Sequence, residues 1–191
     1  MISSRMTEWV QEILLPYVKK GTVLVDGTCG NGHDTFFLAQ NAPLNAKIFS
    51  FDIQAQAIEQ TAQILNENQL QNSIDFILGC HSQLDEWISE SIDVGMFNLG
   101  YLPGSDKSIK TCLEKSLVGI QKICEKLSLH GALSIICYPG HTEGQSEYEG
   151  ISQFLQKLSS KEYQVMRLQG WNRNSTAPVA FLIERIKEDA K

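Results

Sequence analysis

The sequence has no long apolar run. Nowhere do consecutive apolar residues approach the ~18 to 20 that are needed to span a bilayer. The first twenty residues carry Glu8 and Glu12 inside their apolar pattern. A signal peptide needs an uninterrupted apolar core and a cleavage site, and neither occurs there. We therefore expect a soluble, cytoplasmic protein that is not exported and has no contact with membranes.

Cysteine pairs with metal-ligand spacing are also missing. The cysteines are odd in number, include no C-x-x-C pair and lie mostly within apolar segments: Cys29, Cys80, Cys112, Cys124 and Cys137. This usage is typical of reduced thiols in a cytosol. The sequence predicts no disulfide, no zinc and no other metal site.

The chain has no excess of positive charge. Its 16 Lys and Arg residues are outnumbered by 22 Asp and Glu residues, which gives a formal net charge of −6 at pH 7. A protein that binds nucleic acid with its whole surface is usually strongly basic. An RNA site in this protein must therefore be local.

Internal repeats, low-complexity tracts and linker-like stretches are absent as well. The chain has 191 residues, of which 42% are hydrophobic and 20% charged, as in ordinary globular proteins. That length suffices for one α/β domain with a sizeable core but is short for two. We expect a single domain over residues 1–191, with a helix over residues 1–20 packed on it.

Short apolar segments alternate with amphipathic helical patterns along most of the chain. Segments rich in β-branched and aromatic residues predict seven strands, at residues 22–26, 47–52, 73–78, 92–98, 131–138, 163–168 and 177–185. Apolar residues at three-to-four spacing predict helices near residues 34–41, 54–68, 82–89, 108–129 and 144–159. Only residues 170–176 separate the last two strands, which should form an antiparallel hairpin. The expected fold is a Rossmann-like, mostly parallel seven-stranded sheet with helices on both faces.

A glycine-rich turn follows the first predicted strand. Residues 26–35 read Asp-Gly-Thr-Cys-Gly-Asn-Gly-His-Asp-Thr, which is neither the dinucleotide fingerprint G-x-G-x-x-G nor a P-loop. Glycines permit a tight strand-to-helix turn and let a ligand approach bare backbone. Asp26 at the strand end would repel a pyrophosphate but suits a ligand with an ammonium group. A purely structural turn is the alternative.

Polar residues also follow the other strands, at what should be one edge of the sheet. Asp52 ends the second strand, where its carboxylate can accept hydrogen bonds from both ribose hydroxyls or cap the next helix. His81 follows the third strand, either near an adenine ring or as a satisfied edge residue. Asn98 closes the fourth strand, where its amide can accept hydrogen bonds from a substrate amine. Such convergence predicts a ligand site.

The order of these elements resembles that of class I S-adenosylmethionine-dependent methyltransferases. More narrowly, the turns at residues 26–35 and 97–104, Tyr-Pro-Gly-His at 138–141 and Asn-Arg at 172–173 are similar to those of a bacterial rRNA methylase family. That family includes the transfer-RNA methyltransferase that completes the 5-methylaminomethyl group on the wobble 2-thiouridine. The resemblance implies S-adenosyl-L-methionine as the cofactor and the anticodon arm of a tRNA as the substrate.

The resemblance also implies roles for individual residues. Those expected to hold the cofactor are Asp26, Thr28, Gly30, Asn31, Gly32, Asp34, Thr35, Asp52, Gln54, Cys80, His81 and Asn98. Those expected at the methyl-accepting nitrogen are Asn98, Leu99 and Tyr101. Those expected to contact the RNA or substrate are Gly100, Lys107, Lys110, Tyr138, His141, Asn172 and Arg173. One departure is that Thr28 and Cys29 stand where many enzymes of the class have another glycine.

The expected function is therefore N-methylation of the 5-aminomethyl group of uridine or 2-thiouridine at the tRNA wobble position. Two alternatives stay open: an enzyme of the same fold that acts on rRNA or a small amine, and a nucleotide-binding module without catalysis. The positive charge of Lys107, Lys110, Lys115 and Arg173 should gather beside the site and give a small footprint on RNA. A homodimer is a further expectation, because an anticodon arm is larger than the surface that one small domain offers.

Overall fold

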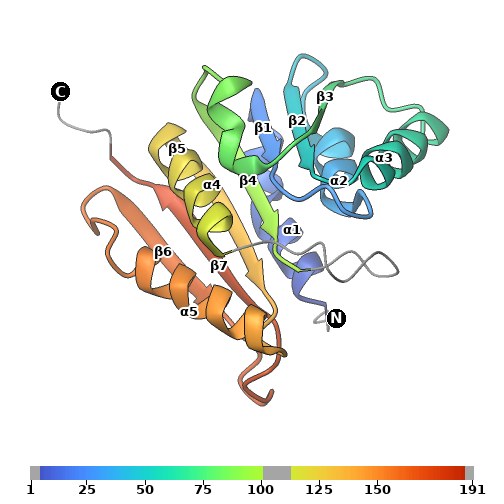
Figure 1. Ribbon diagram of the computed structural model, residues 1–191. Coiled ribbons are helices and arrows are strands. Elements are labelled where there is room, and N and C mark those ends of the chain that lie inside the picture. The colour runs from blue at the N-terminus through green and yellow to red at the C-terminus, as the bar shows by residue number, and fades with distance from the viewer. Residues whose placement is uncertain (1–4, 101–112, 188–191) are drawn as a thin grey trace.

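One seven-stranded sheet forms the centre of the computed structural model, which describes residues 5–100 and 113–187. Its strand order is β3-β2-β1-β4-β5-β7-β6 (Figure 1). The strands are β1 Val23–Asp26, β2 Lys47–Asp52, β3 Ser73–Leu78, β4 Ile92–Asn98, β5 Leu127–Cys137, β6 Tyr163–Leu168 and β7 Val179–Arg185. β7 runs antiparallel to β5 and β6, and the other pairs are parallel. The predicted fold, with its antiparallel C-terminal hairpin, is confirmed.

Helices cover both faces of this sheet. One face carries α1 (Met6–Val18), α2 (His33–Asn41) and α3 (Ala55–Glu67). The other carries the short 3₁₀ helix η1 (His81–Glu86), α4 (Leu113–Lys126) and α5 (Thr142–Leu155). In Figure 1, α4 and α5 stand in front of the sheet and α1 behind it. Within the described ranges, no helix is both long enough and apolar enough to cross a membrane.

The alternation of side chains along the strands explains the two layers. In β1, Val23 and Val25 belong to the core under α4 and α5, whereas Leu24 belongs to the core under α1. In β4, Phe97 belongs to the core under α4 and α5, and Met96 belongs to the core under α1. Successive side chains of a strand point to opposite faces, so a strand buried on both faces is apolar at nearly every position. This is why the central strands could be recognised as continuous apolar segments.

The connectivity creates a crevice at the carboxyl edge of the sheet between β1 and β4. From β1 the chain moves outward through β2 to β3, and then returns to place β4 on the other side of β1. Ligands of open α/β sheets bind at such a reversal point. The β6–β7 connection lies at the same edge, because Val179 at the start of β7 pairs with Cys137 at the end of β5.

The predicted helix over residues 108–129 is wrong at its C-terminal end. Residues 127–129 belong to β5, because Leu127 is buried and pairs with Ile92 on β4. The pairing then shifts, and His130 takes a φ of 63° in the bulged segment. A single apolar residue such as Leu127 fits a helical or a strand pattern equally well, so periodicity could not place this boundary. Residues 108–112 lie outside the described part of the chain.

The helix predicted over residues 144–159 begins and ends earlier, as α5 at Thr142–Leu155. Its beginning is fixed by His141, whose ring nitrogen Nδ1 accepts a 3.0 Å hydrogen bond from the Gly144 N–H. Leu158 still packs against the core, but from the turn that follows the helix. Because Leu158 is apolar and fits the helical spacing, the predicted helix ran beyond the observed end of α5.

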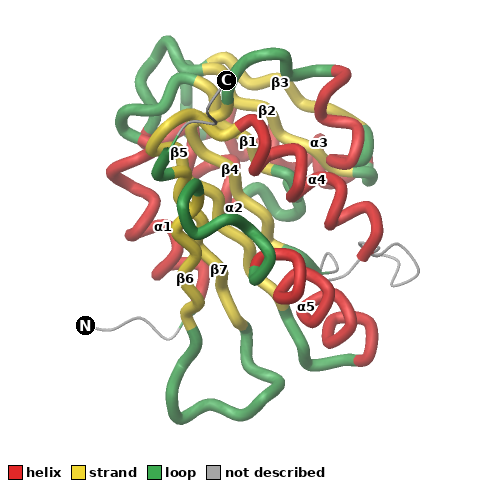
Figure 2. The backbone as a smooth tube through the Cα atoms, turned by 90° about the vertical axis from the view of Figure 1, so that its left-hand side faces the viewer, coloured by secondary structure: helices red, strands yellow, loops and turns green. Residues whose placement is uncertain are grey.

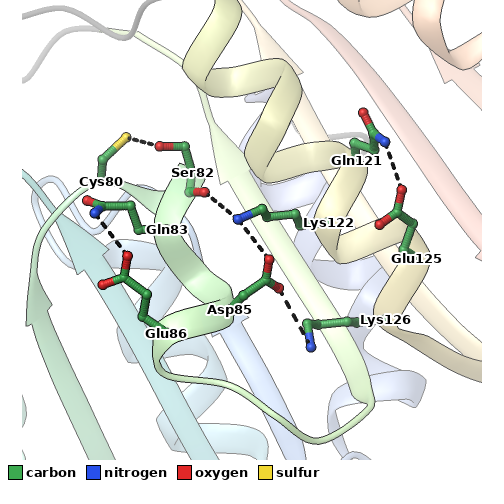
Figure 3. Close-up of polar contacts among 9 residues, drawn as sticks. All are labelled: Cys80, Ser82, Gln83, Asp85, Glu86, Gln121, Lys122, Glu125 and Lys126. Atoms are coloured by element: carbon green, nitrogen blue, oxygen red, sulfur yellow. Dashed lines mark hydrogen bonds and ion pairs between the residues drawn. The ribbon is translucent and has the colours of Figure 1, made fainter.

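An ion-pair cluster joins η1 to α4 (Figure 3). Lys122 Nζ lies 2.7 Å from a carboxylate oxygen of Asp85 and donates a 2.8 Å hydrogen bond to the Ser82 carbonyl. Lys126 Nζ lies 3.6 Å from the other carboxylate oxygen of Asp85. These contacts fix the segment that follows β3 against α4, and this segment forms one wall of the crevice.

Candidate active site

A cavity of about 610 Å³ opens at the carboxyl edge, over β1 and β4. Its volume lies within the usual range of small-ligand pockets. Of the residues predicted for the site, those that line it are Thr28, Gly30, Asn31, Asp34, Asp52, Gln54, Cys80, His81, Asn98, Gly100, Tyr138 and His141. The topology of the sheet thus brings together residues from the ends of five strands.

Other predicted residues lie elsewhere. The buried residues Asp26, Gly32, Thr35 and Leu99 stand behind the cavity wall and do not line it. Asn172 and Arg173 are exposed in the β6–β7 connection, which reaches the cavity only through Thr176. Tyr101, Lys107 and Lys110 fall outside the described residues.

The glycine-rich turn needs glycine at two positions. Gly30 and Gly32 have φ values of 52° and 79°, in the left-handed region that side-chain-bearing residues rarely adopt. A Cβ on Gly32 would also meet Thr61 Oγ1 at 2.6 Å. Gly32 directly precedes α2, so the turn sets the N-terminus of this helix at the cavity. A helix N-terminus presents unpaired N–H groups and favours negative charge.

Asp26 is buried beneath this turn and does not line the cavity, and its expected role in holding the cofactor stays a prediction. Its two carboxylate oxygens accept hydrogen bonds from the Thr28 N–H at 3.0 Å and the Thr35 hydroxyl at 2.6 Å. The Thr35 hydroxyl has one hydrogen and donates it to Asp26. The Ser50 hydroxyl must therefore be the donor in the 2.8 Å hydrogen bond between Ser50 and Thr35. Burial, together with the negative charge of Asp34, raises the pKa of Asp26 to about 7.

Asp34 and Asn98 form a connected polar group on the cavity wall. Gln11 of α1 donates a 2.8 Å hydrogen bond to Asp34 Oδ1, and the Asn98 amide nitrogen lies 3.5 Å from Asp34 Oδ2. The Tyr138 hydroxyl donates a 2.8 Å hydrogen bond to Asn98 Oδ1. These partners define which way the Asn98 amide points. Burial raises the pKa of Asp34 above its usual range, although its hydrogen bonds oppose the shift.

Asp52 is half-buried at the end of β2 and lines the cavity. Each of its carboxylate oxygens accepts one hydrogen bond within the protein. Oδ2 accepts a 2.8 Å hydrogen bond from the Gly30 N–H, and Oδ1 accepts a 2.9 Å bond from the Gln54 N–H. A carboxylate has about four lone-pair sites, so each oxygen can accept one more hydrogen bond from a ligand. The arrangement suits a pair of neighbouring hydroxyls.

Thr28 and Cys29 have structural reasons to replace glycine. The Thr28 hydroxyl accepts a 2.8 Å hydrogen bond from the Asn98 N–H and so ties the β1 turn to the end of β4. The Cys29 thiol donates a 3.0 Å hydrogen bond to Thr61 Oγ1, while the Cys29 N–H donates to the Phe51 carbonyl at 2.8 Å. Burial raises the pKa of the Cys29 thiol to about 11, so it stays protonated.

His81 is buried at the cavity wall beneath α4. Its Nδ1 lies 3.0 Å from the Gly27 carbonyl, which can only accept, so the ring carries its hydrogen on Nδ1. The ring packs edge-on against Phe97 with centroids 5.2 Å apart. Burial lowers the pKa of His81 to about 4, and its Nε2 has no hydrogen-bond partner among the described residues. His81 is therefore neutral and keeps an acceptor free.

The sequence pattern did not reveal Gln11, Thr7 or Thr176 as site residues. Thr7 and Thr176 line the cavity, and Gln11 holds Asp34 in place. Thr7 and Gln11 stand four residues apart and so share a face of α1. A pair of polar residues on one face of α1, beside its apolar stripe, was the sequence feature that could have indicated their role in the site. Thr176 comes from the hairpin connection, whose approach to the cavity depends on tertiary structure.

In the parts of the chain that the structure describes, no group of three or more His, Cys, Asp or Glu residues could hold a metal ion. The cysteines that the structure describes are free thiols: Cys29, Cys80, Cys124 and Cys137.

The strand order, with an antiparallel β7 and a ligand cavity over β1 and β4, is that of the class I methyltransferase fold. A profile of the "Putative rRNA methylase" family matches residues 48–184, and the chain belongs to this family. It is accordingly a methyltransferase that depends on S-adenosyl-L-methionine.

Three relatives support this conclusion. The chloroplastic tRNA (mnm(5)s(2)U34)-methyltransferase of Arabidopsis thaliana is 29% identical over 191 residues, which cover 95% of this chain and 70% of the relative. A "putative rRNA-methylase" from Clostridium thermocellum is 33% identical with a TM-score of 0.92, covering 97% of this chain and 100% of its own. A "putative methyltransferase" from Streptococcus mutans, solved in complex with SAH, is 32% identical with a TM-score of 0.86, covering 97% and 99%.

Proposed function

We propose that the protein transfers a methyl group to the 5-aminomethyl nitrogen of uridine or 2-thiouridine at the wobble position of a tRNA. The observation that carries this proposal is the Asn98 amide, held between Tyr138 and Asp34 on the cavity wall. Asn98 presents an amide oxygen and Asp34 a carboxylate, and both groups can accept hydrogen bonds from an amine. The name of the Arabidopsis relative supports the choice of the wobble uridine.

The cavity residues fit S-adenosylmethionine, which supplies a methyl group on a positively charged sulfonium. Asp52 would accept hydrogen bonds from the ribose hydroxyls through its two free lone-pair sites. Gln54 would lie at the adenine edge, and Cys80 and His81 would flank the ring. The methionine part would be held by Thr28, Gly30 and Asn31 of the turn, whose adjoining helix N-terminus favours a carboxylate.

The accepting amine must lose a proton before it can react, because an ammonium has no lone pair. Asp34 is suited to take this proton, since burial raises the pKa of its carboxyl group above the usual range and makes it a stronger base. Asn98 Oδ1 would hold the neutral amine in line with the methyl group. Bound S-adenosylmethionine would supply the methyl group to this nitrogen as its carbon–sulfur bond breaks, and the methylated ammonium would then release a proton. Alignment of this kind can lower a barrier by ~7 to 11 kcal/mol.

Asn98→Ala tests the proposed acceptor role. On tRNA that carries the 5-aminomethyl group, kcat should fall by about 100-fold, comparable to the loss of one preorganised hydrogen-bonding group in other active sites. Asn66→Ala, on the exposed surface of α3, is the matched control and should keep the wild-type kcat. Wild-type kcat in Asn98→Ala would show that the amide does not hold the amine.

The substrate class is tested by following labelled methyl groups into separate pools. Protein and labelled cofactor are incubated with tRNA, with rRNA and with a small-molecule extract. Label in the tRNA alone supports the proposal. Label in rRNA or in a small amine would contradict the proposed substrate but support methyltransferase activity. No label in any pool would favour a binding module without catalysis.

A further inference from the structure

The connection between β6 and β7, residues 169–178, carries an uncovered tryptophan. The exposed fraction of Trp171 is 102%, so its indole contacts almost nothing else in the protein. Residues 169–176 are all exposed, and Ala177 and Pro178, which lead into β7, are partly buried. Figure 2 shows this loop extending below the ends of β6 and β7. Tryptophan side chains are highly buried on average and are enriched at binding interfaces, so a wholly exposed indole points to a binding role.

The connection also belongs to a stretch that contains no negative charge. Between Glu162 and Glu184 the sequence has no Asp or Glu, although the chain has 22 of them, and it has two arginines, Arg167 and Arg173. Arg173 is exposed two residues after Trp171. The hairpin connection of this acidic protein thus carries a positive charge and no carboxylate of its own.

This edge adjoins the cavity. Thr176, in the same connection, lines the cavity, and its carbonyl oxygen lies 3.5 Å from the place of a Cβ on Gly140, another lining residue. A ligand that extends out of the cavity on this side would meet the connection.

The residue types in the connection match the chemistry of unpaired RNA. Every base has a flat face that stacks on an aromatic ring, and arginine pairs with phosphate. Asn172 and Asn174 add amide groups, which can both donate to and accept from base edges. A protein partner would be expected to bury the indole within a wider apolar patch. Here its neighbours are Gly170 and Asn172.

We propose that residues 169–176 bind the unpaired bases of an RNA loop, with Trp171 stacked on a base and Arg173 paired with a phosphate. The RNA is the substrate class of the proposed function, on which this inference rests. The surface would hold the loop while one of its nucleotides enters the cavity.

Three variants test the stacking role through the affinity for an RNA hairpin with an unpaired loop. Trp171→Ala should weaken binding by about 5- to 150-fold, the range for loss of one base–aromatic stack. Trp171→Phe keeps an aromatic face and should retain most of the affinity. The control is Trp87→Ala, which removes a tryptophan that is 55% exposed after η1, on the chain segment leading to the opposite edge. It should bind like the wild type.

Arg173→Ala tests the phosphate contact through salt dependence. The slope of log K against log salt should decrease in magnitude by roughly 0.7, the value for one contact to a single strand. Lys20→Ala, an exposed cation at the amino edge, should leave the slope unchanged. An unchanged slope in Arg173→Ala would overturn the phosphate contact.

Other results would overturn the inference as a whole. One is hairpin affinity that Trp171→Ala leaves intact, and another is equal losses for the hairpin and for a blunt duplex of its stem. A change in oligomeric state without a change in RNA affinity would instead identify a contact between copies of the chain.

The same assays separate the two proposals. If tRNA is methylated and Trp171→Ala leaves its KM unchanged, the inference fails and the proposed function survives. If the hairpin binds through Trp171 but no tRNA is methylated, the proposed function fails and the RNA surface survives. Both hold if Trp171→Ala raises KM for tRNA and keeps kcat at saturating RNA.

Discussion

Acid should destabilise the protein through His81. The folded protein holds this ring neutral to a pKa of about 4, because the ring is buried against Phe97 and α4. The unfolded chain takes up a proton at the ordinary value of 6.5. The stabilising contribution is therefore complete above pH 6.5 and is lost as the pH falls toward 4.

The shift gives a magnitude for this loss. Between pH 7.5 and pH 5, protonation of the unfolded state alone should remove about 2 kcal/mol of unfolding free energy. Asp26 works in the opposite direction, because its pKa is raised to about 7 and its contribution is lost as the pH rises. The two effects overlap in the wild type, so the net pH dependence cannot isolate His81.

A difference measurement isolates it. Urea unfolding of the wild type and of His81→Gln at pH 5, 6 and 7.5 gives two free-energy profiles in which the Asp26 contribution cancels. The stability difference between them should shrink by about 2 kcal/mol as the pH falls to 5. The control is Asn66→Ala on the exposed surface of α3, which changes no titratable group, so its profile should run parallel to the wild type. A difference for His81→Gln that stays constant with pH would refute the reasoning.

Two further substitutions test the walls of the cavity. Gly119→Ala on α4 would place a Cβ 2.6 Å from His81 Cδ2 and 3.2 Å from its carbonyl oxygen, so unfolding free energy should drop by about 1–3 kcal/mol; unchanged urea unfolding would contradict this packing. Asp52→Asn should raise the dissociation constant of S-adenosylhomocysteine about tenfold or more in calorimetric titration, because one acceptor oxygen becomes an NH2 group and the remaining oxygen is no longer charged. Wild-type affinity would mean that Asp52 does not hold the ribose.

The strands were the most predictable part of the fold. The segments 47–52, 73–78, 92–98 and 163–168 match the observed strands residue for residue, because runs of β-branched and aromatic residues fit the pleated sheet. The start of β5 was missed, since Leu127 pairs with Ile92 through a contact distant in the sequence. Local pattern cannot reveal such a pairing.

The sequence predicted which edge of the sheet carries the candidate site, but not which side chains at that edge face the cavity. Parallel strands bring their carboxyl ends together, so Asp52 and Asn98 could be expected in one cavity. Which way a strand-end side chain points depends on register, and this is why Asp26 lies under the turn and not in the cavity. Gln11 reaches Asp34 from a helix more than twenty residues away in the sequence, and only packing brings them together.

Positively charged residues lie at the cavity although the chain as a whole is acidic. Lys115 lines the cavity, and Trp171 and Arg173 stand in a stretch without carboxylates beside it. A small RNA footprint at this edge is compatible with a net charge of −6. The expected homodimer stays a prediction.

Mass spectrometry of tRNA nucleosides tests the central claim most directly. A tRNA that carries the 5-aminomethyl group at the wobble uridine is incubated with the protein and S-adenosylmethionine, then digested to nucleosides. Our account predicts that this nucleoside gains the mass of one methyl group, and that Asn98→Ala forms the product about 100-fold more slowly. An unmodified wobble nucleoside after incubation with the wild-type protein would contradict the account.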